Sequence, residues 1–168
     1  MSNTKDWIAL IGNPNSGKSS VFNALTGLNQ KVGNFPGVTV DKKTGTFLTA
    51  DGKTQHLIDL PGLYSLFANS KDEQLVAEIL TNEQHEFHPH KVVYVIDVLQ
   101  LERHLLLATQ LIDMGFPVIV AVNMMDLASR QRMEIDIDVL KKKLGVPVVA
   151  ISARTLDNLD QLKETIGS

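Results

Sequence analysis

The residues best suited to chemistry lie near the start of the chain, where positions 12–19 read Gly-Asn-Pro-Asn-Ser-Gly-Lys-Ser. This run matches the pattern G-x-x-x-x-G-K-[ST] and stands between a strand-like apolar segment at 7–11 and a helical pattern at 18–26. Backbone N–H groups at the start of a helix bind phosphates, because the helix dipole adds positive potential there. Lys18 is expected to bridge the β- and γ-phosphates, and the Ser19 hydroxyl to ligate Mg²⁺. The predicted phosphate site comprises Gly12, Asn13, Pro14, Asn15, Ser16, Gly17, Lys18, Ser19 and Ser20.

Two further groups can complete a hydrolytic metal site. Asp59 follows a strand-like segment and opens the run Asp-Leu-Pro-Gly. Its carboxylate is expected to hold Mg²⁺ through water, and the Gly62 N–H to meet the γ-phosphate. Thr39 lies in segment 30–41, which we predict to be a mobile loop because few of its side chains can pack in a core. If the Thr39 hydroxyl ligates the same ion, the order of this loop depends on the γ-phosphate.

A second group of polar residues is predicted to recognise a base. The run Asn-Met-Met-Asp at 123–126 follows one apolar segment, and Ser-Ala-Arg at 152–154 follows another. A carboxylate accepts hydrogen bonds from N1–H and the 2-amino group of guanine, whereas adenine leaves it unpaired, so Asp126 predicts selection of GTP over ATP. Asn123 would brace the loop and the Ala153 N–H would donate to guanine O6; the alternative is that Asn123 and Asp126 form a helix-capping pair. The predicted base site comprises Asn123, Met124, Asp126, Ser152, Ala153 and Arg154.

The elements that must position these residues alternate between short apolar runs and helical patterns. Such alternation predicts an α/β fold, a parallel sheet with helices on both faces. Asp51-Gly52 indicates a hairpin that adds one antiparallel edge pair. The predicted strands are 7–11, 42–48, 54–58, 92–97, 118–122 and 148–151, and the predicted helices are 18–26, 72–81, 102–114, 135–144 and 156–166. In helix 102–114 we expect Leu105, Ala108, Leu111 and Ile112 to face the sheet.

Length and composition narrow the remaining possibilities. The 168 residues fit one domain, and 43% hydrophobic with 21% charged residues is typical of globular proteins. The absence of cysteine excludes disulfide frameworks, thiolate metal sites and thiol nucleophiles. A net charge of -3 gives no indication of nucleic-acid binding. The apolar runs are shorter than the roughly 20 residues of a membrane helix, and segment 1–7 has no signal-peptide core, so a soluble cytosolic domain is expected.

In this order, the motifs resemble those of Ras-like regulatory GTPases, and their details resemble the N-terminal G domain of the ferrous iron transport protein B (FeoB) family. The resemblance rests on GNPNSGKS at 12–19, VGNFPGVTVD at 32–41, DLPGLYS at 59–65, Leu-Glu-Arg at 101–103 and NMMD at 123–126. It implies a P-loop NTPase fold of the Ras-like G-domain type: six strands, mostly parallel with one antiparallel edge strand, and five helices. By this resemblance, segment 30–41 corresponds to switch I, and the segment after Asp59 corresponds to switch II. Switch I is expected to contribute Gly33, Phe35, Pro36, Gly37, Val38 and Thr39 to the nucleotide site, with the Phe35 ring covering the nucleotide.

Two departures from the Ras pattern bear on hydrolysis. Residue 63 is Leu, where Ras-like enzymes place a water-orienting Gln, and switch I contains no Arg, so hydrolysis of GTP to GDP and phosphate is expected to be slow. By resemblance to potassium-activated GTPases, Asn15 and the Gly33 and Phe35 carbonyls would bind K⁺, which offsets transition-state charge. The alternative for Asn15 is a plain turn residue. Met124 replaces the Lys common in this motif, which predicts modest guanine affinity. The expected catalytic residues are Asn15, Lys18, Thr39 and Gly62.

The resemblance also implies a larger native protein. Members of this family continue into a helical domain and a membrane-spanning transport domain, so residues 1–168 are expected to be the GTP-binding domain of a ferrous iron transporter. That domain would be tethered to the cytoplasmic face of the bacterial inner membrane and would self-associate through its switch regions. Two other functions stay open: a ribosome- or tRNA-associated GTPase, and a nucleotide-sensing module with negligible hydrolysis.

Overall fold

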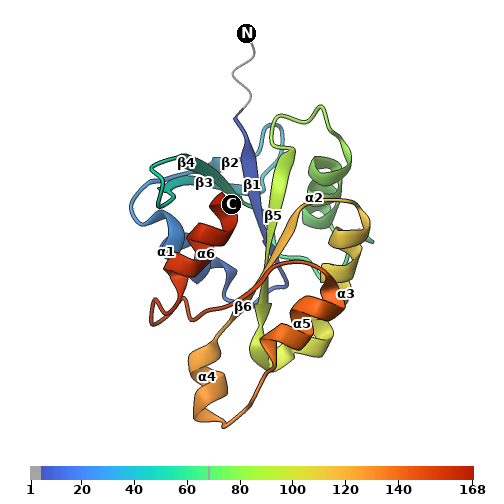
Figure 1. Cartoon of the computed structure of the whole chain (residues 1–168). Helices are drawn as coiled ribbons and strands as arrows, with labels where there is room; N and C mark the ends of the chain where they lie inside the picture. The colour runs from blue at the N-terminus through green and yellow to red at the C-terminus, as the bar shows by residue number, and fades with distance from the viewer. Residues whose placement is uncertain (1–4, 68) are drawn as a thin grey trace.

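The computed structural model describes residues 5–67 and 69–168, and this part of the chain forms a seven-stranded sheet between two layers of helices (Figure 1). The expected domain range of 1–168 thus begins with four residues that lie outside the described part. The strands are β1 Trp7–Gly12, β2 Gln30–Asn34, β3 Asp41–Leu48, β4 Thr54–Asp59, β5 Pro89–Asp97, β6 Val118–Asn123 and β7 Val148–Ala150. The helices are α1 Lys18–Thr26, α2 Lys71–Thr81, α3 Leu101–Asp113, α4 Met125–Arg130, α5 Ile137–Leu144 and α6 Leu159–Gly167, with a short 3-10 helix, η1, at Val98–Gln100.

The sheet has the strand order β2-β3-β4-β1-β5-β6-β7. β1 lies at its centre, and all six of its residues are buried, as expected for a strand covered on both faces. The parallel pairings set Leu10 beside Asp59, Gly12 beside Val95, and Asp97 beside Asn123. Because the carboxyl ends of parallel strands meet at one edge of a sheet, this register gathers the polar residues that follow β1, β4 and β6.

The β3–β4 hairpin confirms the prediction made from Asp51-Gly52. Gly52 has a φ of 81°, and its N–H donates to the Thr49 carbonyl at 2.9 Å. β3 runs antiparallel to both neighbours, so the reversed strand is second in the sheet, whereas we predicted it at the edge.

The edge strand is β2, which was predicted to belong to a mobile loop. Its residues pair with β3 from Gln30↔Gly45 to Asn34↔Asp41, so hydrogen bonds to β3 stabilise it. Its side chains are exposed except for the half-buried Gln30, and an exposed strand of this kind has no hydropathy signal. The sheet therefore has one strand more than the six expected.

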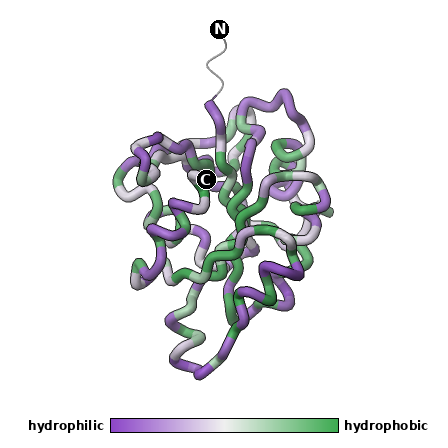
Figure 2. The backbone as a smooth tube through the Cα atoms, in the orientation of Figure 1, coloured by the Kyte–Doolittle hydropathy of each residue, from purple (hydrophilic) through white to green (hydrophobic). Residues whose placement is uncertain are grey.

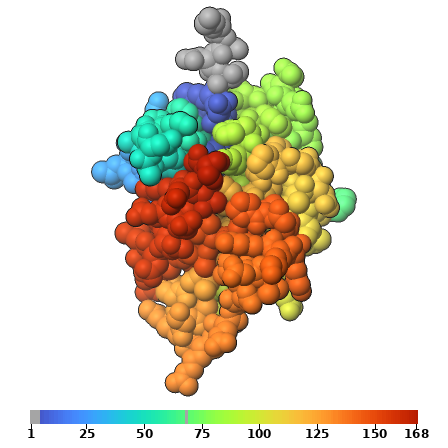
Figure 3. Space-filling model, in the orientation of Figure 1, coloured from blue at the N-terminus to red at the C-terminus, as the bar shows by residue number. Residues whose placement is uncertain are grey.

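Two sets of helices cover the faces of the sheet, and apolar residues gather between the layers (Figure 2). α2, α3 and α5 pack on one face through residues such as Ile79, Leu111 and Leu140, while α1 and α6 pack on the other through Phe22 and Leu162. Figure 3 shows the C-terminal part of the chain, in orange and red, forming most of one side of the molecule. None of the helices in the described part is long and apolar enough to cross a bilayer.

The predicted helices agree with the structure to within three residues at each end, and α4 is an additional helix. The buried face of α3 differs from the expectation. Its buried residues are His104, Leu107, Ala108 and Leu111, whereas Leu105 and Ile112 are only partly buried. The buried face of α3 is thus shifted by about one residue from the predicted one. It includes His104, which a search for apolar residues does not identify.

Candidate functional site

The loop between β1 and α1 has the backbone geometry of a phosphate site. Gly17 and Asn15 adopt left-handed conformations with φ of 83° and 67°, and the Ser16 N–H donates to the Asn13 carbonyl at 3.2 Å. A Cβ atom on Gly17 would lie 2.4 Å from Nδ2 of Asn123, so only glycine fits there. The loop ends at Lys18, the first residue of α1, and therefore directs free N–H groups to the carboxyl edge of the sheet.

Switch II begins in direct contact with this loop. Lys18 Nζ forms an ion pair with Asp59 Oδ1, and the two side chains are 12% and 11% exposed. A Cβ atom on Gly62 would lie 3.2 Å from the backbone nitrogen of Pro14, and the Leu63 N–H donates to the Gly12 carbonyl at 3.1 Å. The structure thus brings Lys18, Asp59 and Gly62 together beside the loop.

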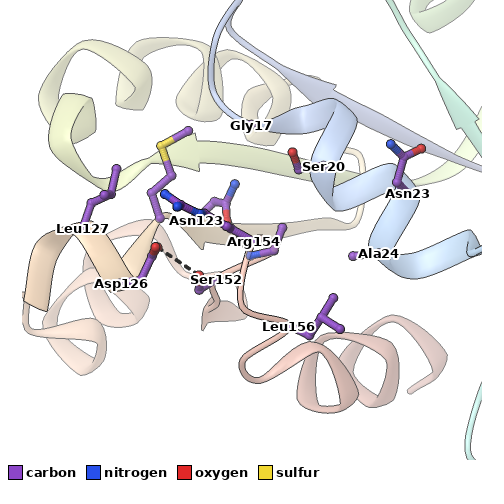
Figure 4. Close-up of a pocket in the computed structure, with 12 residues that line it drawn as sticks. Gly17, Ser20, Asn23, Ala24, Asn123, Asp126, Leu127, Ser152, Arg154 and Leu156 are labelled. Carbon is purple, nitrogen blue, oxygen red and sulfur yellow. Dashed lines mark hydrogen bonds between the residues drawn. The ribbon is translucent and has the colours of Figure 1, made fainter.

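A cavity of about 560 Å³ lies beside the loop, in the size range of small-molecule sites. Figure 4 shows the side chains that converge on it from α1, from the end of β6 and from the segment after β7. Asn123 is 2% exposed and joins its two sides, because Nδ2 donates to the Ser16 carbonyl at 3.3 Å while Oδ1 accepts from the Ala153 N–H at 3.0 Å. The cavity is lined by Gly17, Ser20, Asn23, Ala24, Asn123, Met124, Asp126, Leu127, Ser152, Ala153, Arg154 and Leu156.

Asp126 lines this cavity. Its Oδ1 accepts from the Ser152 hydroxyl at 2.9 Å, whereas Oδ2 is buried without a partner in the described part of the chain. A buried acceptor of this kind is costly unless a ligand donor pairs with it. The helix-capping alternative does not describe these residues: Met124 occupies the N-cap of α4 with φ of 68°, and no side chain caps that helix.

Switch I residues are not brought to the site in this structure. The Phe35 N–H donates to the Val40 carbonyl at 3.0 Å and the Val38 N–H to the Phe35 carbonyl at 3.3 Å, so the segment folds into a turn of its own beyond β2. The expected ligand Thr39 is exposed on this turn. Gly33 pairs with Lys42 of β3. The same segment contains Pro36, Gly37 and Val38, all exposed.

In this structure the Phe35 ring does not line the cavity, whereas we expected it to cover the nucleotide. Phe35 is 2% exposed, and its ring packs edge-on against Phe87 with centroids 5.6 Å apart. A large aromatic side chain gains more free energy by burial than over an open pocket, which explains its place in the core.

The residues present fit a guanine nucleotide with Mg²⁺. The unpaired Asp126 Oδ2 suits a base donor, and the loop N–H groups with Lys18 suit phosphates. The Ser19 hydroxyl, in the first turn of α1, and the Asp59 carboxylate supply the oxygen donors that Mg²⁺ prefers.

Two buried polar residues beside the loop were missed by the sequence analysis. Tyr94 lies within an apolar strand, and His104 lies on the buried face of α3. Burial lowers the pKa of His104, which favours the neutral imidazole. The position of Tyr94 inside an apolar strand was the only signal in the sequence, and His104, in an amphipathic helix, had none.

Comparison with known proteins agrees with this geometry. The family model described as ferrous iron transport protein B matches residues 6–166. The Fe(2+) transporter FeoB of Legionella pneumophila (strain Paris) is 46% identical over 164 residues, which span 94% of this chain but only 21% of that protein.

Solved structures give the same result. The cytosolic domain of the T. maritima FeoB iron transporter in its GMPPNP form superposes with a TM-score of 0.89 at 44% identity, covering 96% of this chain and 62% of that one. The GDP form I of the same cytosolic domain has a TM-score of 0.89 at 43% identity, and the match covers 97% of this chain and 62% of that one. With this agreement in sequence and fold, the chain belongs to the ferrous iron transport protein B family.

Proposed function

We propose that this chain is a GTP-binding domain that hydrolyses GTP slowly, with Mg²⁺ and K⁺, and regulates a ferrous iron transporter. The observation that carries the proposal is the Asn123 side chain, which links the phosphate loop at Ser16 to the base loop at Ala153. One nucleotide can therefore contact both loops at once. Relatives described in GMPPNP and GDP forms support a guanine nucleotide as the ligand.

The base contacts follow from the hydrogen bonds that remain free. Asp126 Oδ2 is buried here, and it would accept from the guanine N1–H or 2-amino group once the side chain turns toward the cavity, while Ser152 holds the other carboxylate oxygen. The Ala153 N–H already donates to Asn123, and guanine O6 would share this donor. Met124 supplies an apolar surface next to Gly17, because its Cε would lie 3.1 Å from a Cβ atom there. The base is thus selected by a carboxylate and held between apolar atoms.

The phosphates would rearrange the charges at the loop. Lys18 is paired with Asp59 here, and a triphosphate would compete for its ammonium group. Asp59 would then be free to hold Mg²⁺ together with Ser19. When bound, Mg²⁺ neutralises charge that develops on the phosphates. Lys18, Ser19 and Asp59 therefore form the phosphate and metal end of the site.

Switch I would join the site only after moving. Thr39 is exposed on its turn, and we propose that it becomes a metal ligand when a γ-phosphate is bound. The carbonyls of Gly33 and Phe35 would approach Asn15 in the same movement and, with it, hold K⁺. Asn15 is exposed and held in a left-handed turn. Its amide would then face the phosphates and the ion.

Hydrolysis is proposed to be slow because residue 63 is Leu, where Ras-like enzymes have a water-orienting Gln. Leu63 is 1% exposed and packs in the core. The same observation favours a second candidate, a nucleotide-sensing module with negligible hydrolysis. Single-turnover phosphate release measured over hours separates the two: a rate above that of free GTP supports hydrolysis, and no release supports the sensing module.

Turnover in matched KCl and NaCl buffers tests the cation proposal. We expect faster hydrolysis in KCl and loss of the difference in Asn15→Gly. An Asn158→Gly variant serves as the matched control, because Asn158 also has a left-handed backbone, with φ of 62°, and does not line the cavity. Equal rates in both salts for the unchanged protein would remove K⁺ from the proposal and leave nucleotide binding intact.

The wider context is also proposed from the family. The chain spans about a fifth of the length of the curated relatives, so a helical domain and a membrane transport domain are proposed as its partners within the native protein. We further propose attachment at the cytoplasmic face of the bacterial inner membrane and self-association through the switch regions. Membership of a transporter family favours this role over that of a ribosome- or tRNA-associated GTPase.

A further inference from the structure

A tyrosine in the centre of the sheet holds the first half of the phosphate loop. Tyr94 lies in β5 and is fully buried. Its hydroxyl lies 2.6 Å from Oδ1 of Asn13 and 2.6 Å from the carbonyl oxygen of His104 in the first turn of α3. Asn13 is itself 3% exposed. One hydroxyl therefore connects β5, the phosphate loop and α3.

The chemistry of the three groups fixes the direction of these hydrogen bonds. A phenol has one hydrogen to donate, and the His104 carbonyl can only accept. The hydroxyl therefore donates to His104, and Asn13 must turn its NH₂ group to the phenol oxygen, since amide oxygen and nitrogen are assigned from such networks. Burial raises the pKa of Tyr94, so the phenol stays protonated as this arrangement requires.

The far end of this network is also held in place. The Asp97 N–H donates to Nδ1 of His104 at 3.2 Å, and the Asp97 carboxylate accepts from the Leu99 N–H at 2.9 Å. The start of α3 is thus fixed against the end of β5. Tyr94 anchors Asn13 to a rigid part of the molecule.

The two halves of the phosphate loop have different anchors. Asn123 holds Ser16 and joins the second half to the base cavity. Tyr94 holds Asn13, whose neighbour Pro14 lies against Gly62, the residue proposed to meet the γ-phosphate. In the proposed complex a diphosphate would depend mainly on the second half, whereas a γ-phosphate and its cation at Asn15 would depend on the first.

We propose that Tyr94 is a positioning residue for the γ-phosphate end of the site: through Asn13 it sets the Asn13-Pro14-Asn15 backbone and so controls GTP turnover and K⁺ use without controlling GDP affinity. This inference rests on the proposed GTP binding. It assigns a function to a residue that does not line the nucleotide cavity.

The variant Tyr94→Phe tests the inference, because it keeps the ring and removes only the hydroxyl. We expect GDP affinity within about 2-fold of the unchanged protein. The turnover rate should fall, and the K⁺ concentration for half-maximal stimulation should rise, by about 5- to 30-fold, the range that loss of a buried hydrogen bond corresponds to. Thr26→Val is the matched control, since it removes a buried hydroxyl that donates to Phe22 at 2.8 Å at the other end of α1.

Several results would overturn the inference. Equal losses of GDP affinity and turnover, or the same losses in Thr26→Val, would indicate general destabilisation. Asn13→Ala should also lower turnover while retaining GDP affinity. Adding Tyr94→Phe to Asn13→Ala should then cause little further loss of turnover. Additive losses in the double variant would show that Tyr94 does not act through Asn13. If Tyr94→Phe does not fold, the split in Asn13→Ala alone decides. Failure of the unchanged protein to bind GDP would instead refute the proposed function.

Discussion

The base specificity of the cavity depends on one atom, Oδ2 of Asp126. In Asp126→Asn, Oδ1 remains able to accept from Ser152, so the local fold is retained, while Oδ2 becomes an NH₂ group. The guanine N1–H or 2-amino group then meets a donor in place of an acceptor. Loss of one hydrogen bond to a charged group costs about 1.5–3 kcal/mol, which corresponds to about 10- to 150-fold weaker GDP binding.

The same exchange should improve binding of xanthosine diphosphate, which offers an oxygen at the position of the 2-amino group. Titration of both diphosphates by isothermal calorimetry avoids any contribution from hydrolysis. Asp157→Asn is the matched control, because Asp157 is an exposed acid in the loop that contains Ser152 and is paired with Ser152 through its backbone. Unchanged GDP affinity in Asp126→Asn, with no gain for the xanthosine nucleotide, would refute the assignment of this cavity to the base.

Three further substitutions separate the roles of individual residues. Gly17→Ala should weaken GDP binding more than about 10-fold in the same titration. The new Cβ atom would lie 2.4 Å from Asn123, and the left-handed backbone costs a non-glycine residue about 1–3 kcal/mol. Normal GDP affinity would contradict this close approach. Leu63→Gln, although it restores the Ras residue, should lower the unfolding free energy by about 1–3 kcal/mol without raising turnover, because the amide enters the core; a faster enzyme of normal stability would contradict this. Phe35→Ala should lower the unfolding free energy by about 3–5 kcal/mol in urea denaturation, while GDP affinity changes little. Normal stability with weaker GDP binding would indicate instead that the ring contacts the nucleotide.

Much of the fold could be predicted because its strands are buried on both faces. Segments such as 92–97 and 118–122 are apolar almost throughout, and Asp51-Gly52 has the chemistry of one kind of turn. β2 could not be predicted in this way, because its stability comes from hydrogen bonds to β3 and its side chains face water. Hydropathy reports burial of side chains and says nothing about pairing of the backbone.

The candidate site, like the fold, could be predicted from the sequence only in part. Gly17, Lys18, Asp59, Asn123 and Asp126 could be found from spacing, and the structure places them around one loop and one cavity. The position of Phe35 could not, because a motif shows which residues recur and not which conformation a segment adopts. Tyr94 was missed for another reason: its hydroxyl acts on a residue 81 positions away in the chain.

The burial of Phe35 has a consequence for nucleotide discrimination. If Thr39 becomes a metal ligand as proposed, we expect the hydrogen bond between Phe35 and Val40 to open or the Phe35 ring to leave Phe87 and the core. Triphosphate binding would then include the free-energy cost of moving the Phe35 side chain out of its packed position. Diphosphate binding would not include this cost. The ratio of GTP to GDP affinity should consequently be smaller than the contacts of the third phosphate alone would give, and this domain would release the triphosphate more readily than one whose loop is already in place.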